Sequence, residues 1–233
     1  MSTAAWRAGV HRLAPMLAPL TSLVGVLALW QAASVWGNVP AMLLPRPLQA
    51  LQALLELFVS GEVWQHLGAT LKGAAVGYAL GSALALVLAA LMAVYRPLDR
   101  LLMTHVQAFQ AIPKVALAPL VFIWFGFGSA STIALVTMSC FYPVFVNAFV
   151  GFRAADPHLI DLYRAFGAGR GRTFWSVRLP WAASQIFVGL EIGVVFSLIS
   201  AVVMEFICGT EGLGYLIQAA STTLDTASVF ASL

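Results

Sequence analysis

Three ionisable side chains lie inside apolar stretches of the sequence, where charged groups are rare: Lys114, Glu191 and Glu205. A charge inside a membrane is costly, so such a residue usually faces a polar interior or a transport path. Glu191 and Glu205 are fourteen residues apart, which places them within about 40° of each other on one face of a regular helix. The alternative is that both lie near the membrane boundaries and extend toward the headgroups.

The other groups that could bind a metal or act as nucleophiles show no useful spacing. Cys140 and Cys208 lie in or at the edge of apolar runs, which favours a packing role over a disulfide or a thiolate site. The histidines are scattered without ligand spacing, and we expect interfacial positions for all four: His11, His66, His105 and His158. No span carries a paired set of histidine and acid, so neither an intramembrane enzyme nor a cofactor is expected.

The composition indicates which solvent surrounds these residues. Of the 233 residues, 61% are hydrophobic, and the mean hydropathy is +0.92. A soluble domain has roughly 45–50% apolar residues, so lipid must surround much of this chain. The net charge of +3 does not indicate nucleic-acid binding, because the topology of a membrane protein explains the basic residues more simply. We therefore predict an all-α, polytopic transmembrane helical bundle, with residues 1–233 forming a single transmembrane domain.

Five segments are long and apolar enough to span the hydrocarbon core, which needs about 20 residues of helix. The first follows a basic leader, and its apolar run is longer than that of a signal peptide, so we predict an uncleaved anchor. An amphipathic stretch between the first and second spans, Leu51–Phe58, is predicted to be a short interfacial helix. The predicted spans are Leu17–Trp36, Leu71–Val94, Leu101–Phe125, Ser129–Val150 and Ile186–Ile207.

Glycines and prolines modify two of these spans. Gly73, Gly77 and Gly81 recur every four residues on one face of the second span, which lets another helix approach closely. Pro113 and Pro119 each remove a backbone donor from the third span, so a kink or break is expected at both.

The arginines predict the orientation. With a cytoplasmic amino terminus, nine of them fall on the cytoplasmic side, whereas only Arg46 and Lys72 fall outside and Lys114 lies within a span. The excess of positive charge in cytoplasmic loops therefore favours this orientation. The nine are Arg7, Arg12, Arg96, Arg100, Arg153, Arg164, Arg170, Arg172 and Arg178.

The cytoplasmic loop Gly151–Ala183 contains two predicted short helices. Asp156 and Pro157 are typical of a helix start, Gly167 is typical of a helix end, and a second helical stretch is predicted to stop at Pro180. The alternating glycines do not predict a phosphate-binding loop, because no strand precedes them and no Gly-Lys-Ser/Thr follows. The arginines of this loop fix the topology, bind anionic lipid headgroups, or do both.

The loop resembles the cytoplasmic EAA loop of binding-protein-dependent ABC importer permeases. That motif reads Glu-Ala-Ala, three residues, Gly, nine residues, Ile, one residue and Leu-Pro. Asp161, Gly167, Val177 and Leu179–Pro180 match it without a gap, although Leu162 and Tyr163 replace the two alanines. Four other stretches are similar to the nitrate, sulfonate and taurine subgroup of these permeases: "TLKGAAVGYALGSALALVLAALM", "AIPKVALAPLVFIWFGFG", "FYPVFVNAFVGF" and "EGLGYLIQAAS".

The resemblance implies a permease subunit of the bacterial inner membrane. Its partners would be ABC ATPase subunits, a periplasmic solute-binding protein and a second permease subunit, and it would carry no ATP chemistry. The expected substrate is a small solute, either an anion of the nitrate, sulfonate or taurine type or another small nutrient. The residues expected to couple to the ATPase are Asp161, Tyr163, Arg164, Ala165, Gly167, Val177, Leu179 and Pro180. The candidates for the translocation path are Gln107, Gln110, Lys114, Asn147, Glu191 and Glu205.

Membership of this family also implies six spans, whereas five are found. A sixth would begin at Ser228–Leu233, where the sequence ends, so it is either truncated or absent. If it is absent, the carboxyl terminus lies outside and transport competence is in doubt. The alternative function is a secondary transporter that uses Glu191 or Glu205 for ion coupling, although the inverted repeats typical of that class are not found.

Overall fold

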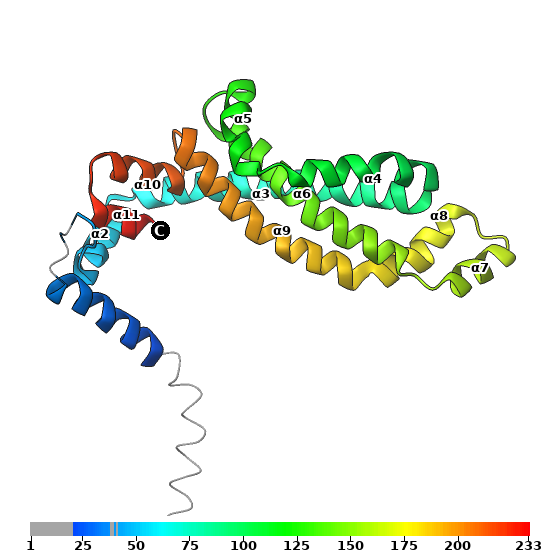
Figure 1. Cartoon of the computed structure of the whole chain (residues 1–233), viewed down its shortest axis with the longest axis horizontal. Coiled ribbons are helices and arrows are strands. Elements are labelled where there is room, and N and C mark those ends of the chain that lie inside the picture. Colours follow the sequence, from blue (N-terminus) through cyan, green and yellow to red (C-terminus); the bar gives the residue numbers. More distant parts are fainter. Residues whose placement is uncertain (1–20, 38–39, 41) are drawn as a thin grey trace, which may run out of the picture. The chain divides into compact units, whose positions relative to one another are not determined.

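The computed structural model describes residues 21–37, 40 and 42–233, and this part of the chain is helical without strands (Figure 1). It divides into two compact units. The first combines the described residues up to Gly61 with Ala219–Leu233, and the second is Glu62–Gln218. The predicted all-α class is therefore confirmed.

Three helices form most of the first unit: Thr21–Trp36, α2 (Pro47–Ser60) and α11 (Thr226–Ser232). The indole N–H of Trp30 donates to the carbonyl of Pro45 at 3.0 Å, and its ring lies 5.3 Å from that of Phe230. The predicted interfacial helix falls within α2, which ends at Gly61 with a left-handed φ of 81°. The first predicted span is described only as Thr21–Trp36, since the residues before it lie outside the described part.

Three long helices form the centre of the second unit: α3 (Glu62–Val94), α6 (Ser129–Arg153) and α9 (Leu179–Cys208). Helix α6 packs extensively against both of the others. The contact with α3 requires glycine, because a methyl group at Gly77 would lie 2.6 Å from Cβ of Val136. The close helix approach predicted for the glycines of α3 is thus confirmed.

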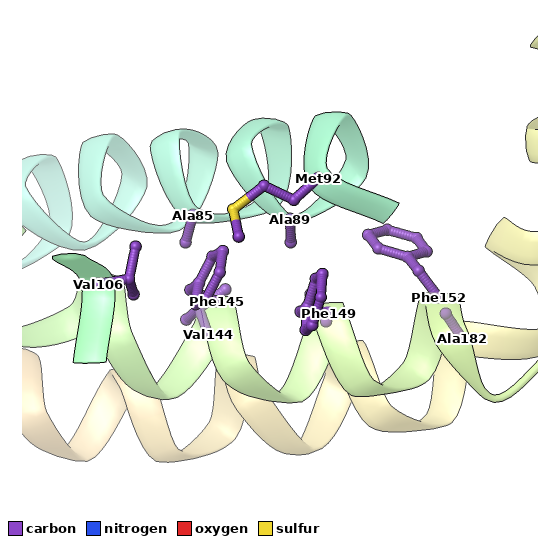
Figure 2. Packing of buried hydrophobic residues seen from close by; sticks show 10 residues of the cluster. Ala85, Ala89, Met92, Val106, Val144, Phe145, Phe149, Phe152 and Ala182 are labelled. Atoms are coloured by element: carbon purple, nitrogen blue, oxygen red, sulfur yellow. The ribbon is translucent and has the colours of Figure 1, made fainter. Parts of the chain in front are cut away.

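The core of this unit combines bulky and small residues. Phe145, Phe149 and Phe152 of α6 lie opposite Ala85 and Ala89 of α3 and are buried (Figure 2). The ring of Phe145 is almost parallel to those of Phe141 and Phe149, with centroids 5.7 Å apart in each pair. Small side chains on α3 make room for these rings, so the side chains of the two helices can interdigitate.

The third predicted span is broken. Helix α4 (Arg96–Ala111) ends before Pro113, and η1 (Lys114–Leu117) with α5 (Ala118–Phe125) continues at an angle of 85°. The break predicted at Pro113 is confirmed. The break predicted at Pro119 is wrong. This residue lies in the first turn of α5, where an absent N–H costs no helical hydrogen bond.

Within the described residues, three helices are long and apolar enough to cross a membrane, or four if the bent pair counts as one span. The five predicted spans therefore correspond to these four and the shorter helix Thr21–Trp36. The remaining helical segments of the second unit are α7 (Pro157–Ala165), α8 (Arg170–Thr173), the π-helical turn η2 (Phe174–Arg178) and the first part of α10 (Leu213–Thr222).

Candidate functional site

The predicted coupling helix is α7, and its ends agree with the sequence pattern. The Asp156 carboxylate accepts a hydrogen bond from the N–H of His158 at 2.9 Å, and Pro157 occupies the first turn. At the other end Gly167 has a φ of 78°, a conformation that residues with a Cβ rarely adopt. These local signals set both ends of α7.

The prediction that a second short helix of the loop stops at Pro180 is wrong. Helix α8 and the turn η2 run directly into α9, so Arg170–Cys208 is one continuous helical segment of 39 residues. The π-helical turn shifts the hydrogen-bond register just before Pro180, and the absent N–H of proline is accommodated within the first turn of α9. The end of the loop therefore belongs to the same helical segment as α9.

One face of α7 packs on this continuous helix. Ile160 and Val177 are buried together with Ala155, and Leu159 and Tyr163 pack against them. This small cluster fixes α7 beside η2. Among the predicted coupling residues, Tyr163 and Val177 are therefore internal supports of the loop.

The opposite face of α7 is exposed. Leu162 is 51% exposed, and Phe166, the residue at which α7 ends, is 84% exposed. Asp161 and Arg164 form an exposed ion pair at 3.6 Å, which contributes little to stability. Ala165 and Pro180 are also exposed. Sequence reasoning missed Leu162 and Phe166, although both lie inside the motif.

Arg178, for which the sequence predicts a role in topology, in binding lipid headgroups, or in both, also holds three helices together. Its guanidinium donates to the carbonyl of Ala93 at 3.0 Å and to that of Phe152 at 3.2 Å. These carbonyls belong to the last turns of α3 and α6, where helical partners are missing. The hydrogen bonds of a charged donor contribute about 1.5–3 kcal/mol each. Leu179, the next residue, is half-buried against the core.

Two of the candidates for the path meet at the break in the third span. The Lys114 ammonium donates to the backbone carbonyl of Gln110 at 3.0 Å and also to its side-chain oxygen. The same ammonium lies 6.0 Å from the ring of Tyr142 on α6. Gln107 is exposed one turn earlier on α4. The break thus places a cation and amide groups near α6.

Asn147 and Glu191 lie on different surfaces. The Asn147 amide donates to the carbonyl of Pro143 at 2.8 Å, and its Cβ is next to Gly189, so it belongs to the contact between α6 and α9. Glu191 is exposed and has no hydrogen bond or ion pair within the described part of the chain. The structure therefore does not bring these two candidates together.

The position of Glu191 along α9 makes its exposure significant. It lies about 18 Å from Leu179 and about 26 Å from Cys208 along a regular helix. If the hydrocarbon layer of about 30 Å lies within α9, Glu191 is inside it at every possible position of the layer. A carboxylate at that depth must face water or another protein.

Glu205 is 4% exposed and accepts two hydrogen bonds. One comes from the Thr70 hydroxyl of α3 at 2.8 Å, and the other comes from the N–H of Gly214 at 3.1 Å. The loop after α9 folds back over this carboxylate, and a methyl group at Gly212 would lie 2.2 Å from its carboxyl carbon. Glu205 therefore joins α3, α9 and the loop 209–214.

Two further contacts complete this group of residues. We call it the Glu205 cluster, and it consists of His66, Thr70, Glu205, Gly212 and Gly214. The N–H of Gly212 donates to Nδ1 of His66 at 2.9 Å, and the N–H of Leu213 donates to the Thr70 hydroxyl at 2.8 Å. Sequence reasoning missed Thr70 and His66. The signal available was the "EGLG" stretch, whose glycines permit the close approach. Residues 21–37, 40 and 42–233 contain no group of three or more His, Cys, Asp or Glu side chains that could hold a metal ion.

Comparison with known proteins identifies the family. The chain belongs to the family described as "Binding-protein-dependent transport system inner membrane component", whose model matches residues 67–233. It is 34% identical over 215 residues to SsuC of Escherichia coli (strain K12), whose name refers to aliphatic sulfonate transport; the match covers 92% of this chain and 80% of SsuC. It is 35% identical over 219 residues to the riboflavin transport system permease protein RibX of Chloroflexus aurantiacus, covering 94% and 82% of the two chains.

A solved structure supports the fold. A chain of the MetNI methionine ABC transporter matches with a TM-score of 0.62 at 20% identity, over 74% of this chain and 89% of that one. The family confirms the resemblance seen in the loop: the chain is a membrane permease subunit of an ABC importer, which works with ATPase and binding-protein partners. This result favours the importer over the ion-coupled secondary transporter.

Proposed function

We propose that the chain is a non-catalytic permease subunit that transmits ATP-driven movement through α7 to its spans. In this proposal it lies in a bacterial inner membrane with its amino terminus in the cytoplasm. Residues 1–233 act as one permease domain, and two copies enclose a path for a small solute delivered by a periplasmic binding protein. Hydrolysis of ATP occurs in the separate ATPase subunits.

The observation that carries this proposal is the exposed apolar surface on α7. Leu162 and Phe166 extend from a helix that is fixed on its other face and is followed by a continuous helical segment through the membrane. Exposed aromatic side chains on a rigid helix are typical of contact residues in protein interfaces. We therefore assign the contact with the ATPase to this surface, with Asp161 next to it on the exposed side of α7.

The experiment is Phe166→Ser, measured by copurification with the ATPase subunit and by ATP-driven uptake into proteoliposomes. We expect the loss of an anchor side chain to cost about 2 kcal/mol of docking energy, a reduction in affinity of roughly thirtyfold. Phe127, which is 69% exposed in the turn before α6, provides a control as Phe127→Ser. Normal copurification and uptake by Phe166→Ser would remove the coupling role of α7.

The orientation can be tested with single cysteines in a chain lacking Cys140 and Cys208. Ser176→Cys, in the exposed turn η2, should resist a membrane-impermeant thiol reagent in intact cells and react after permeabilisation. Labelling from outside would place the loop on the wrong side for an ATPase. The matched position Thr222→Cys should react in intact cells.

The relatives suggest the chemical range of the substrate. The name of SsuC refers to aliphatic sulfonates and that of RibX to riboflavin, at nearly the same identity to this chain. We propose a small solute, either an anion of the nitrate, sulfonate or taurine type or another small nutrient, for which Lys114, Gln107 and Gln110 offer polar contacts along the path. Uptake of a panel of sulfonates, nitrate and vitamin precursors, with the cognate binding protein present, would identify the class.

A further inference from the structure

An apolar groove of about 320 Å³ lies between the end of α3 and the helical segment that begins at Arg170. Its walls include Val87, Leu91 and Val94 of α3, with Phe174 from η2. Val87 is 60% exposed and Leu91 is 42% exposed, so the groove is open at its side. Its volume is at the lower end of the range for ligand-binding pockets.

A positive charge lies at one end of this groove. The guanidinium of Arg170 lies over the ring of Tyr95, 5.7 Å from its centroid. Tyr95 directly follows Val94, the last residue of α3. Val87 is about 12 Å further along the helix axis, toward the apolar centre of α3. The groove therefore has a cationic end and apolar walls, which would complement the phosphate and the acyl chain of a phospholipid.

The segments at this end of α3, α6 and α9 carry more positive charge than their acidic side chains can balance. Residues 95–100 and 151–183 contain seven arginines and only three aspartates. The charge of Arg178 is repelled by Arg164, Arg153 and Arg96. Arg170 itself has no ion pair among the described residues. An anion held by Arg170 would lower the net positive charge at this end of the helices, and basic pockets at the ends of membrane helices are suited to anionic headgroups.

The same charges argue against a second copy of this chain as the occupant. Each of the three aspartates already has a partner: Asp99 pairs with Arg153 at 2.9 Å, Asp161 pairs with Arg164, and Asp156 caps α7. A second copy would bring arginines to this level without a free carboxylate. Charge complementarity thus favours an anionic lipid.

We propose that this groove binds one anionic phospholipid, with its phosphate held by Arg170 and one acyl chain lying along α3 from Val94 to Val87 against Phe174. The lipid would fill the space between α3 and the start of the segment that continues into α9. The proposal rests on the membrane location of the chain and not on its transport function, so either can fail without the other.

The test uses the full chain, purified in mild detergent and stripped of lipid, with native mass spectrometry to count bound lipids. Phosphatidylglycerol should bind with one strong site, and phosphatidylcholine should bind at least several-fold more weakly. Arg170→Gln should weaken phosphatidylglycerol binding about tenfold, since it removes a charged hydrogen-bond donor. Arg172→Gln is the matched control: it changes the net charge equally but lies outside the groove, and we expect less than a twofold change.

A second variant tests the apolar part of the groove. Ala90→Phe places a ring in it without changing the charge and should weaken binding of the same lipid, while Val87→Trp, at an exposed position, serves if Ala90→Phe does not fold. Equal binding of the two lipids, equal effects of Arg170→Gln and Arg172→Gln, or unchanged binding in the filled groove would overturn the proposal. A groove-filling variant that no longer forms dimers but still binds phosphatidylglycerol would also overturn it, because that result would place a second copy of the chain in the groove.

Discussion

Glu191 and Glu205 are carboxylates of the same helix in opposite environments. Glu205 is 4% exposed and accepts two hydrogen bonds, whereas Glu191 is exposed and has no partner within the described residues. Their similar angular position on α9 does not determine these environments. The difference comes from the loop 209–214, which folds back over one end of the helix only. A buried carboxylate with partners supports the fold, while an exposed one inside the membrane is available for function.

The strongest test of this contrast is Gly212→Ala, which should destroy the Glu205 cluster. Its φ of 106° is strained for alanine, and its methyl group would lie 2.2 Å from the Glu205 carboxyl carbon. Gly126→Ala is the control, because Gly126 also has a positive φ, of 77°, but has open space around it. Backbone strain costs about 1–3 kcal/mol at both positions, and displacement of the carboxylate should add at least about 2 kcal/mol at Gly212. Thermal unfolding in detergent would measure both, and equal losses would show that the close contact is unimportant.

The next largest effect is expected for Glu205→Ala. The Thr70 hydroxyl and the Gly214 N–H would lose their acceptor, at a cost of about 2–4 kcal/mol in unfolding free energy. Glu205→Gln should cost less, because its amide oxygen still accepts one or both of these bonds. The melting temperature should therefore rank wild type, Glu205→Gln and Glu205→Ala in descending order. A Glu205→Ala protein as stable as the wild type would contradict a structural role.

Thr70→Val tests the other side of the same contact and should have a smaller effect. Valine keeps the shape but removes the donor to Glu205 and the acceptor for the N–H of Leu213. We expect a loss of about 1–3 kcal/mol, with stability restored in Thr70→Ser. In combination with Glu205→Gln the losses should be less than additive, as for residues in one network. Full additivity would indicate that the two residues act independently.

The sequence predicts those parts of this contrast that depend on local pattern. The apolar runs predict α3, α6 and α9, Pro113 predicts the break, and Gly167 predicts the end of α7, because each signal acts on its own segment. The Glu205 cluster is beyond such reasoning, since Thr70 and Glu205 are 135 residues apart and meet only in the folded chain. The contacts of Arg178 are beyond it for the same reason, since Ala93 and Phe152 are 85 and 26 residues away along the chain. The prediction that Pro180 stops a helix is wrong, because the preceding π-helical turn accommodates this proline.

The smallest effect on stability and the sharpest test of function is Glu191→Gln. An exposed side chain without partners can change with a cost within about 0.5 kcal/mol, so the melting temperature should remain that of the wild type. If Glu191 faces a path between two copies, removing its charge should reduce ATP-driven uptake several-fold, whereas Glu191→Asp should retain most of it. A cysteine at this position, in a chain without Cys140 and Cys208, should also react with a water-soluble thiol reagent. Normal uptake by a stable Glu191→Gln protein, or a cysteine that stays unreactive, would contradict a role of Glu191 in the translocation path.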